Sequence, residues 1–157
     1  MNIFLLRHAE AVDMAATDFG RSLTQKGEQQ CCRIANFCKK NEIEPDLILS
    51  SPYIRSRQTA EIVARELSAS EPVLEEILGC GMRPEQAMGL IKLYAPKAES
   101  IMLIGHEPDL GTLGAWFIGA RCNTAMHVRK ASLAGFYFDD LEQGRGSLEF
   151  FIPVKYT

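Results

Sequence analysis

The chain begins with a short apolar run that ends abruptly in polar residues. Ile3 to Leu6 are consecutive apolar residues, and Arg7 and His8 follow directly. A run this short and uniformly apolar is typical of a strand buried on both faces. In open α/β sheets, ligands bind just beyond the carboxyl ends of such strands. Arg7 and His8 are therefore candidate functional residues.

Two further apolar runs end in similar residues. Residues 46–50 lead into Ser51-Pro52, where a serine cap and a proline at the first helical position predict a helix start and place Arg55 in the first turn. Residues 100–104 end in Gly105-His106 before another amphipathic stretch. Three strand ends are thus expected to bring two arginines and two histidines to one edge of a sheet.

The rest of the pattern alternates helices with strands. Apolar positions at i, i+3, i+4 and i+7 predict helices; these are expected over 25–40 with Thr24 as the cap, after Pro52, over 84–94 and after Pro108. Short strands are expected at 72–74, 131–138 and 147–152, the last two as an antiparallel pair. The small residues of 11–20 predict a loop near the site. The fold class is α/β, a three-layer α/β/α sandwich with a mixed, mostly parallel sheet.

Length and composition narrow the class of protein. A chain of 157 residues without a linker, repeat or low-complexity segment fits a single domain spanning 1–157. The net charge of −3 with interspersed signs gives no basic surface for nucleic acid, and the apolar runs are too short to cross a membrane. Five cysteines and no secretory leader pattern predict reduced thiols in the cytoplasm. Cys31 and Cys38 share an apolar helix stripe and are expected to pack, and the spacing of a metal site is absent.

Two arginines and two histidines at one sheet edge suit a phosphoryl group, since planar guanidinium groups match phosphate oxygens in pairs. A neutral imidazole is a competent nucleophile toward phosphorus near pH 7. We therefore expect His8 to be the nucleophile, and His106, surrounded by anionic oxygens, to be protonated and to stabilise charge. The predicted reaction transfers the phosphoryl group in line to His8, and water then attacks the phosphohistidine, with no cofactor or metal. The alternative is that these residues are ordinary loop, core and surface positions.

Four segments carry a resemblance to a known family. They are Leu6-Arg7-His8-Ala9, 21–27, 50–60 and Gly105-His106-Glu107-Pro108. In this order they resemble the histidine phosphatase superfamily, whose fold is phosphoglycerate mutase-like. The resemblance implies that His8 is the phosphorylated nucleophile and that Arg7, Arg55 and His106 complete the phosphate pocket.

Within that family the chain looks like the short SixA-type phosphohistidine phosphatases, through its length, its Arg-His-Ala-Glu-Ala opening and its Gly-His-Glu-Pro-Asp-Leu segment. Larger relatives insert a lid between the residues that match Arg55 and His106. Only about fifty residues separate them here, so no large lid insertion and an open pocket are expected. The resemblance then implies a phosphohistidine-bearing protein as substrate, a phosphorelay or phosphotransfer partner.

Glu76 is the candidate general acid, because small-molecule phosphatases of the family carry a glutamate in a Leu-x-Glu segment like Leu74-Glu75-Glu76. The following residues, 79–82, depart from the family pattern, so a solvated carboxylate is the alternative. Imidazole leaves phosphorus more easily than an alkoxide does, and a P–N substrate therefore has less need of an acid. Two rival functions stay open: a phosphatase of small phosphomonoesters that uses Glu76, and an inactive phosphate-binding adaptor domain.

Other charged groups lie near these segments. His127 is expected on a loop or at the surface. Arg129 and Lys130 are either a rim that attracts acidic substrate surfaces or a solvated charge cluster. Glu107 and Asp109 flank the histidine of their segment and either tune its pKa or cap the following helix.

Overall fold

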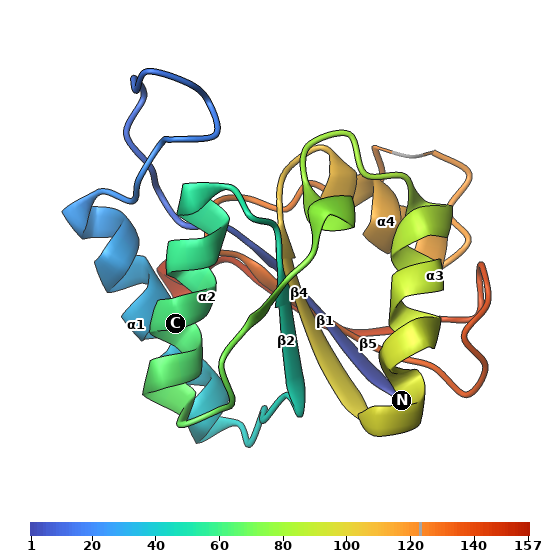
Figure 1. Cartoon of the computed structure of the whole chain (residues 1–157). Coiled ribbons are helices and arrows are strands. Elements are labelled where there is room, and N and C mark those ends of the chain that lie inside the picture. Colours follow the sequence, from blue (N-terminus) through green and yellow to red (C-terminus); the bar gives the residue numbers. More distant parts are fainter. Residues whose placement is uncertain (123) are drawn as a thin grey trace.

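The computed structural model, which describes residues 1–122 and 124–157, contains a six-stranded mixed sheet between two helical layers (Figure 1). The strands are β1 (Asn2–Arg7), β2 (Leu47–Ser50), β3 (Val73–Leu74), β4 (Ser100–Gly105), β5 (Leu133–Tyr137) and β6 (Ser147–Ile152). Their order is β3-β2-β4-β1-β5-β6. The first four are parallel, β5 is antiparallel to β1, and β6 is antiparallel to β5. The predicted α/β/α sandwich with a mixed, mostly parallel sheet is confirmed.

Four α-helices cover the two faces of the sheet. They are α1 (Gln25–Lys40), α2 (Ile54–Leu67), α3 (Pro84–Tyr94) and α4 (Asp109–Phe117), and short 3-10 turns are η1 (Glu76–Leu78), η2 (Ala95–Lys97) and η3 (Val154–Tyr156). One core lies under α1 and α2, and the other lies under α3 and α4 (Figure 1). The chain between Arg55 and His106 is taken up by these elements, so there is no large lid insertion, as predicted. None of the helices in the described ranges has the length and apolar character needed to span a membrane.

Local signals fixed most element boundaries. Thr24 caps α1 as predicted, since its side chain accepts a hydrogen bond from the Gly27 amide at 3.0 Å. The predicted helix start at Ser51-Pro52 is wrong by two residues, because α2 begins at Ile54 with Tyr53 at the N-cap position. The Ser51 hydroxyl is instead held by a histidine from a distant strand end, as described below. Arg55 still falls in the first turn.

Strand register places the candidate residues at one edge of the sheet. Arg7 at the end of β1 pairs with Gly105 at the end of β4, so His8 and His106 leave the sheet at the same level. The His8 amide donates to the Gly105 carbonyl at 3.1 Å, and the Ser51 amide continues the β2–β4 ladder at 2.9 Å to the carbonyl of Ile104. The carboxyl ends of three parallel strands therefore meet at one place.

Candidate functional site

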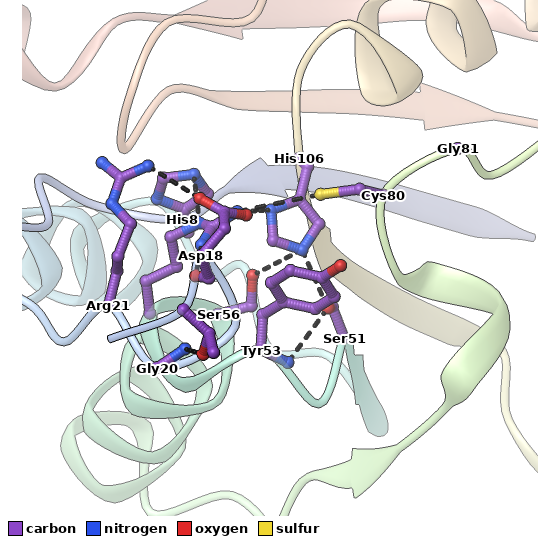
Figure 2. Close-up of polar contacts among 12 residues, drawn as sticks. His8, Asp18, Gly20, Arg21, Ser51, Tyr53, Ser56, Cys80, Gly81 and His106 are labelled. Atoms are coloured by element: carbon purple, nitrogen blue, oxygen red, sulfur yellow. Dashed lines mark hydrogen bonds and ion pairs between the residues drawn. The ribbon is translucent and has the colours of Figure 1, made fainter. Parts of the chain in front are cut away.

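His8 and His106 lie side by side at the ends of β1 and β4. Their ring centroids are 5.3 Å apart with an interplanar angle of 56°. His8 is 5% exposed and His106 is 3% exposed. Figure 2 shows both rings among polar side chains contributed by loops on either side. The two histidines predicted from separate strand ends are thus brought together.

The backbone fixes the tautomer of His8. Its Nδ1 lies 2.8 Å from the carbonyl oxygen of Ala9, and because a carbonyl only accepts, Nδ1 carries the hydrogen. Nε2 then presents a lone pair, which accepts a hydrogen bond from Nε of Arg55 at 3.2 Å. Burial, together with the charges of His106, Arg55 and Arg7, lowers the pKa of His8 to about 3. His8 is therefore neutral near pH 7, with a lone pair on Nε2.

Arg55 is the central cation of the site. It is 4% exposed, and its guanidinium reaches both imidazoles, at 3.2 Å to Nε2 of His8 and 3.3 Å to Nδ1 of His106. It also lies over the ring of Tyr53, 4.9 Å from the centroid. Asp18 accepts from its two terminal nitrogens, through the carbonyl oxygen at 2.6 Å and Oδ2 at 3.0 Å. Arg55 therefore fixes the relative positions of both histidines.

His106 is held between Arg55 and Ser51. A guanidinium only donates, so Nδ1 of His106 is the acceptor and Nε2–H points at Oγ of Ser51, 2.8 Å away. Burial and the charge of Arg55 lower the pKa of His106 to about 4, although Asp18 opposes the shift. Without a bound anion His106 is therefore neutral near pH 7, and its protonated state among phosphoryl oxygens stays a prediction. The negative charge of a phosphoryl group would raise that pKa.

Arg7 lies in a different environment. Its Nη1 donates to the carbonyl oxygen of Val128 at 3.0 Å, while its buried Nε has no hydrogen-bond partner within residues 1–122 and 124–157. Burial and the charge of Arg55 lower the pKa of Arg7, and the carboxylate of Glu107 opposes this. Arg7 also acts electrostatically on both histidines. It therefore lies close enough to both histidines to act on their charge, and its Nε keeps donor capacity that the described residues do not use.

A threonine on α2 joins the His8 segment to Arg55. The Thr59 hydroxyl donates to the carbonyl oxygen of Arg55 at 2.7 Å and accepts from the amide of Ala9 at 3.1 Å. The hydroxyl is buried, so both bonds are shielded from water. The backbone next to the candidate nucleophile is thus bonded to the helix that carries Arg55.

Sequence reasoning missed Asp18. The structure confirms that the 11–20 segment is a loop near the site, and its Asp18 is bonded to Arg55. Figure 2 shows the Asp18 side chain turned toward the site. Arg21 stabilises the loop by donating to Asp18 at 3.0 Å and to the Val12 carbonyl at 2.6 Å. Nothing in the sequence distinguishes Asp18 from Asp13, and an acid is not an expected neighbour for a phosphate pocket. Asp18 covers the pocket where the 11–20 loop passes Arg55, so the pocket is less open than expected.

Cys80 is another neighbour that the sequence did not reveal. Its Sγ lies 3.7 Å from Nη2 of Arg55, on the opposite side of His106 from Asp18 (Figure 2). Burial raises the pKa of the thiol although Arg55 opposes the shift. The Cys80 thiol therefore lies at the edge of the pocket in its protonated form.

Glu76 is not brought into the pocket by any contact in the described ranges. It is exposed at the start of η1, and no side-chain hydrogen bond or ion pair links it to Arg55 or to either histidine. Its neighbour Glu75 accepts from the Tyr94 hydroxyl at 2.6 Å. The role of Glu76 as general acid stays a prediction.

Glu107 and Asp109 organise loops around the site. Glu107 accepts from the amide of Gly111 in the first turn of α4 at 3.2 Å, and from Nδ1 of His127 at 3.1 Å. Asp109 accepts from the amide of Gly81 at 2.7 Å. Neither carboxylate contacts His106 in the described structure, so of the two alternatives helix capping fits Glu107. His127 is exposed, as predicted.

The described side chains contain no group of three or more His, Cys, Asp and Glu residues that could hold a metal ion. The charge at the site comes instead from guanidinium groups. A neutral imidazole nitrogen beside two arginines can attack an electrophile that carries negative charge, and the arginines can stabilise that charge as it shifts.

Comparisons with known proteins agree with this geometry. A family model described as the histidine phosphatase superfamily, branch 1, matches residues 3–79. The phosphohistidine phosphatase SixA of Escherichia coli (strain K12) is 34% identical over 122 residues, which cover 73% of this chain and 73% of that protein. A SixA homolog of Haemophilus influenzae is 31% identical over 132 residues, covering 77% of this chain and 79% of that protein. A solved structure of the protein histidine phosphatase SixA complexed with tungstate superposes with a TM-score of 0.90 at 26% identity, covering 99% of each chain.

Proposed function

Because this chain belongs to the histidine phosphatase superfamily and is a phosphatase, we propose that it removes phosphate from phosphohistidine on a protein, through a phosphorylated intermediate on His8. The observation that carries the proposal is the Nε2 atom of His8. It is an unprotonated nitrogen, fixed by the Ala9 carbonyl and facing an arginine that also reaches His106. The substrates would be phosphorelay or phosphotransfer proteins of the cytoplasm.

Substrate binding requires Arg55 to exchange partners. Its terminal nitrogens are bonded to Asp18, so a phosphoryl group would replace the Asp18 contacts and add the Nε of Arg7, which has no partner among the described residues. Both guanidinium groups would then donate to the phosphoryl oxygens, and so would Nδ1 of His106 once it has bound a proton. The tungstate bound to the SixA structure is a tetrahedral oxyanion, which supports a pocket of this kind.

The chemistry proceeds in two displacements. Nε2 of His8 forms a bond to phosphorus as the P–N bond to the substrate imidazole breaks, and the leaving nitrogen takes a proton from water. A second water then attacks phosphorus, the P–N bond to His8 breaks, and inorganic phosphate is released. Phosphoryl charge raises the pKa of His106, so its Nδ1 can bind a proton and donate it to a phosphoryl oxygen.

The absence of a positioned acid among the described residues favours a P–N substrate. An ester leaves as a strongly basic alkoxide and needs a proton in the transition state, whereas imidazole leaves more readily. Glu76 is exposed, and no side-chain hydrogen bond or ion pair in the described ranges joins it to the pocket residues. The proposed site therefore suits phosphohistidine better than a sugar phosphate.

Turnover on two substrate classes tests the proposal. We expect kcat/KM for a phosphohistidine-bearing protein to exceed that for sugar phosphates by at least about 100-fold, the range that a general acid supplies. Acid-labile phosphate should label the wild-type chain and not His8→Ala, while Glu76→Gln should keep its turnover of phosphohistidine. Hydrolysis of esters alone, abolished by Glu76→Gln, would instead identify a small-molecule phosphatase, and activity unaffected by His8→Ala would remove the proposed nucleophile.

A further inference from the structure

A basic groove lies beside the pocket, at the same edge of the sheet. It has a volume of about 360 Å³ and is lined by His127, Arg129, Phe151, Pro153, Lys155 and Tyr156. The register aligns Leu6 of β1 with Leu133 of β5 and Leu133 with Ile152 of β6. Residues before β5 and after β6 therefore leave the sheet at the level of Arg7. Two strand spacings separate β1 from β6, which is about 10 Å.

The basic groove is continuous with the surroundings of Arg7. A second hollow of about 350 Å³ is lined by Arg7 and Glu107 among others, and His127 lines both hollows. Arg7 is also bonded to the Val128 carbonyl, one residue before Arg129. A chain bound at the pocket can therefore extend along β5 and β6 without leaving the protein surface.

The cations of the basic groove are not neutralised by the protein. Arg129 and Lys155 are exposed, and neither has an ion-pair partner in the part of the chain that the structure describes. Lys155 lies 4.5 Å from the ring centroid of the exposed Tyr156. The charges of Lys155 and Arg129 both lower the pKa of the Tyr156 phenol, so both cations act on the same part of the groove. Glu107, in the adjoining hollow, is already bonded to His127.

This charge stands out on a chain with a net charge of −3. Two exposed cations over the half-buried Phe151 and Pro153 match a short peptide that carries carboxylates and an apolar residue. Nucleic acid and anionic membranes bind to larger basic surfaces than this one. The groove therefore fits an acidic protein segment best.

We propose that the basic groove binds an acidic surface segment of the phosphohistidine-bearing substrate, next to the phosphorylated histidine. The inference rests on the proposed function and adds the kind of partner surface that is recognised. Arg129 and Lys155 would attract the carboxylates during encounter, and Tyr156 with Phe151 would contact apolar side chains. A small phosphorylated imidazole would not reach the groove.

Charge reversal of the basic groove tests the proposal. An acidic histidine-phosphotransfer domain, phosphorylated on its histidine, serves as the protein substrate, and phosphoimidazole serves as the small one. For Arg129→Glu/Lys155→Glu we expect KM for the protein to rise roughly tenfold at low salt with kcat unchanged, because rim charges act mainly on association. The rise should shrink in about 0.3 M salt, where the Debye length is short. Turnover of phosphoimidazole should equal that of the wild type, which also reports correct folding.

Lys92→Glu/Lys97→Glu is the matched control, because it makes the same change in net charge on exposed residues of α3 and η2. An equal rise in KM for the control would reduce the effect to net charge and overturn the proposal. An unchanged KM of Arg129→Glu/Lys155→Glu for the protein substrate would also overturn it. The same holds if this variant loses binding to DNA or to anionic vesicles while its KM stays unchanged. If the wild type hydrolyses phosphoimidazole but no phosphohistidine protein, the proposed function fails independently of the groove.

Discussion

Arg7 and Arg55 are both predicted phosphate ligands, yet the protein holds them differently. Arg55 is bonded to both histidines and to Asp18. Arg7 donates to one backbone carbonyl and keeps a buried Nε without a partner in the described ranges. Under the proposed function, Arg55 would organise the pocket before the substrate arrives, whereas Arg7 would have donor capacity left for the substrate. Removing each arginine should therefore produce a different kinetic defect.

The largest effect is expected for Arg55→Ala. This change removes a transition-state cation and the group that fixes His8 relative to His106, so kcat should fall about 100- to 1000-fold. Steady-state kinetics on phosphoimidazole measure it. Arg57→Ala is the matched control, because Arg57 lies two residues further along α2, is exposed and pairs with Glu61. A similar loss in the control would mean that α2 itself is disturbed.

For Arg7→Ala we expect a smaller loss, seen mainly in KM. One charge-assisted interaction with the phosphoryl group disappears while the Arg55–histidine contacts stay in place, so kcat/KM should fall roughly 10- to 100-fold. The affinity for tungstate as an inhibitor should fall in parallel. If kcat falls as far as in Arg55→Ala while KM stays constant, the proposed division between the two arginines is wrong.

Acid should destabilise the fold through the histidines beside Arg55. The pKa of His8 is lowered to about 3 and that of His106 to about 4, from 6.5. Between these values and 6.5 the unfolded chain binds protons that the folded chain does not, so stability falls as the pH falls. From pH 7 to pH 5 the free energy of unfolding should drop by roughly 1 to 2 kcal/mol per histidine. Urea denaturation at several pH values measures the free energy of unfolding of the wild type and of His8→Ala. If that free energy falls equally with pH in both proteins, the prediction is contradicted.

The smallest effect concerns Asp18. Its carboxylate occupies one donor of Arg55, Nη2, that a phosphoryl group needs, while Nη1 is bonded to the Asp18 backbone carbonyl. Asp18→Asn removes the charge that holds Nη2, so it should bind inorganic phosphate or tungstate more tightly, by roughly two- to fivefold. Asp13→Asn, on the same loop and also exposed, is the matched control. Weaker binding in Asp18→Asn would show that Asp18 supports the pocket instead of competing with its ligand.

Elements defined by local signals were predictable from the sequence. α1 matches its predicted range because its apolar stripe and the Thr24 cap lie within the helix itself, and β6 matches as well. β5 is shorter than predicted, because Ala131 takes a φ of 52° and the regular strand starts only at Leu133. Each of these outcomes depends on residues close in sequence.

The errors at the site have a common cause in long-range contacts. Ser51 looks like a helix cap, but its hydroxyl is bonded to His106, a residue far along the chain. The pKa of His106 depends on Arg55, and Asp18 meets Arg55 only because its loop folds back over the sheet edge. Residue types predicted which side chains meet at the site, whereas the pKa values of its histidines and the position of the Asp18 loop depend on the tertiary structure.

The Thr59 hydroxyl limits how this pocket can move. Because it is bonded to the Ala9 amide and to the Arg55 carbonyl, the backbone segments that carry His8 and Arg55 are joined through one side chain. Under the proposed function, a bulky substrate would be admitted by movement of the loops 11–20 and 79–83, while these two hydrogen bonds stay in place. Evolution could reshape that entrance for new partners without retuning the chemical step.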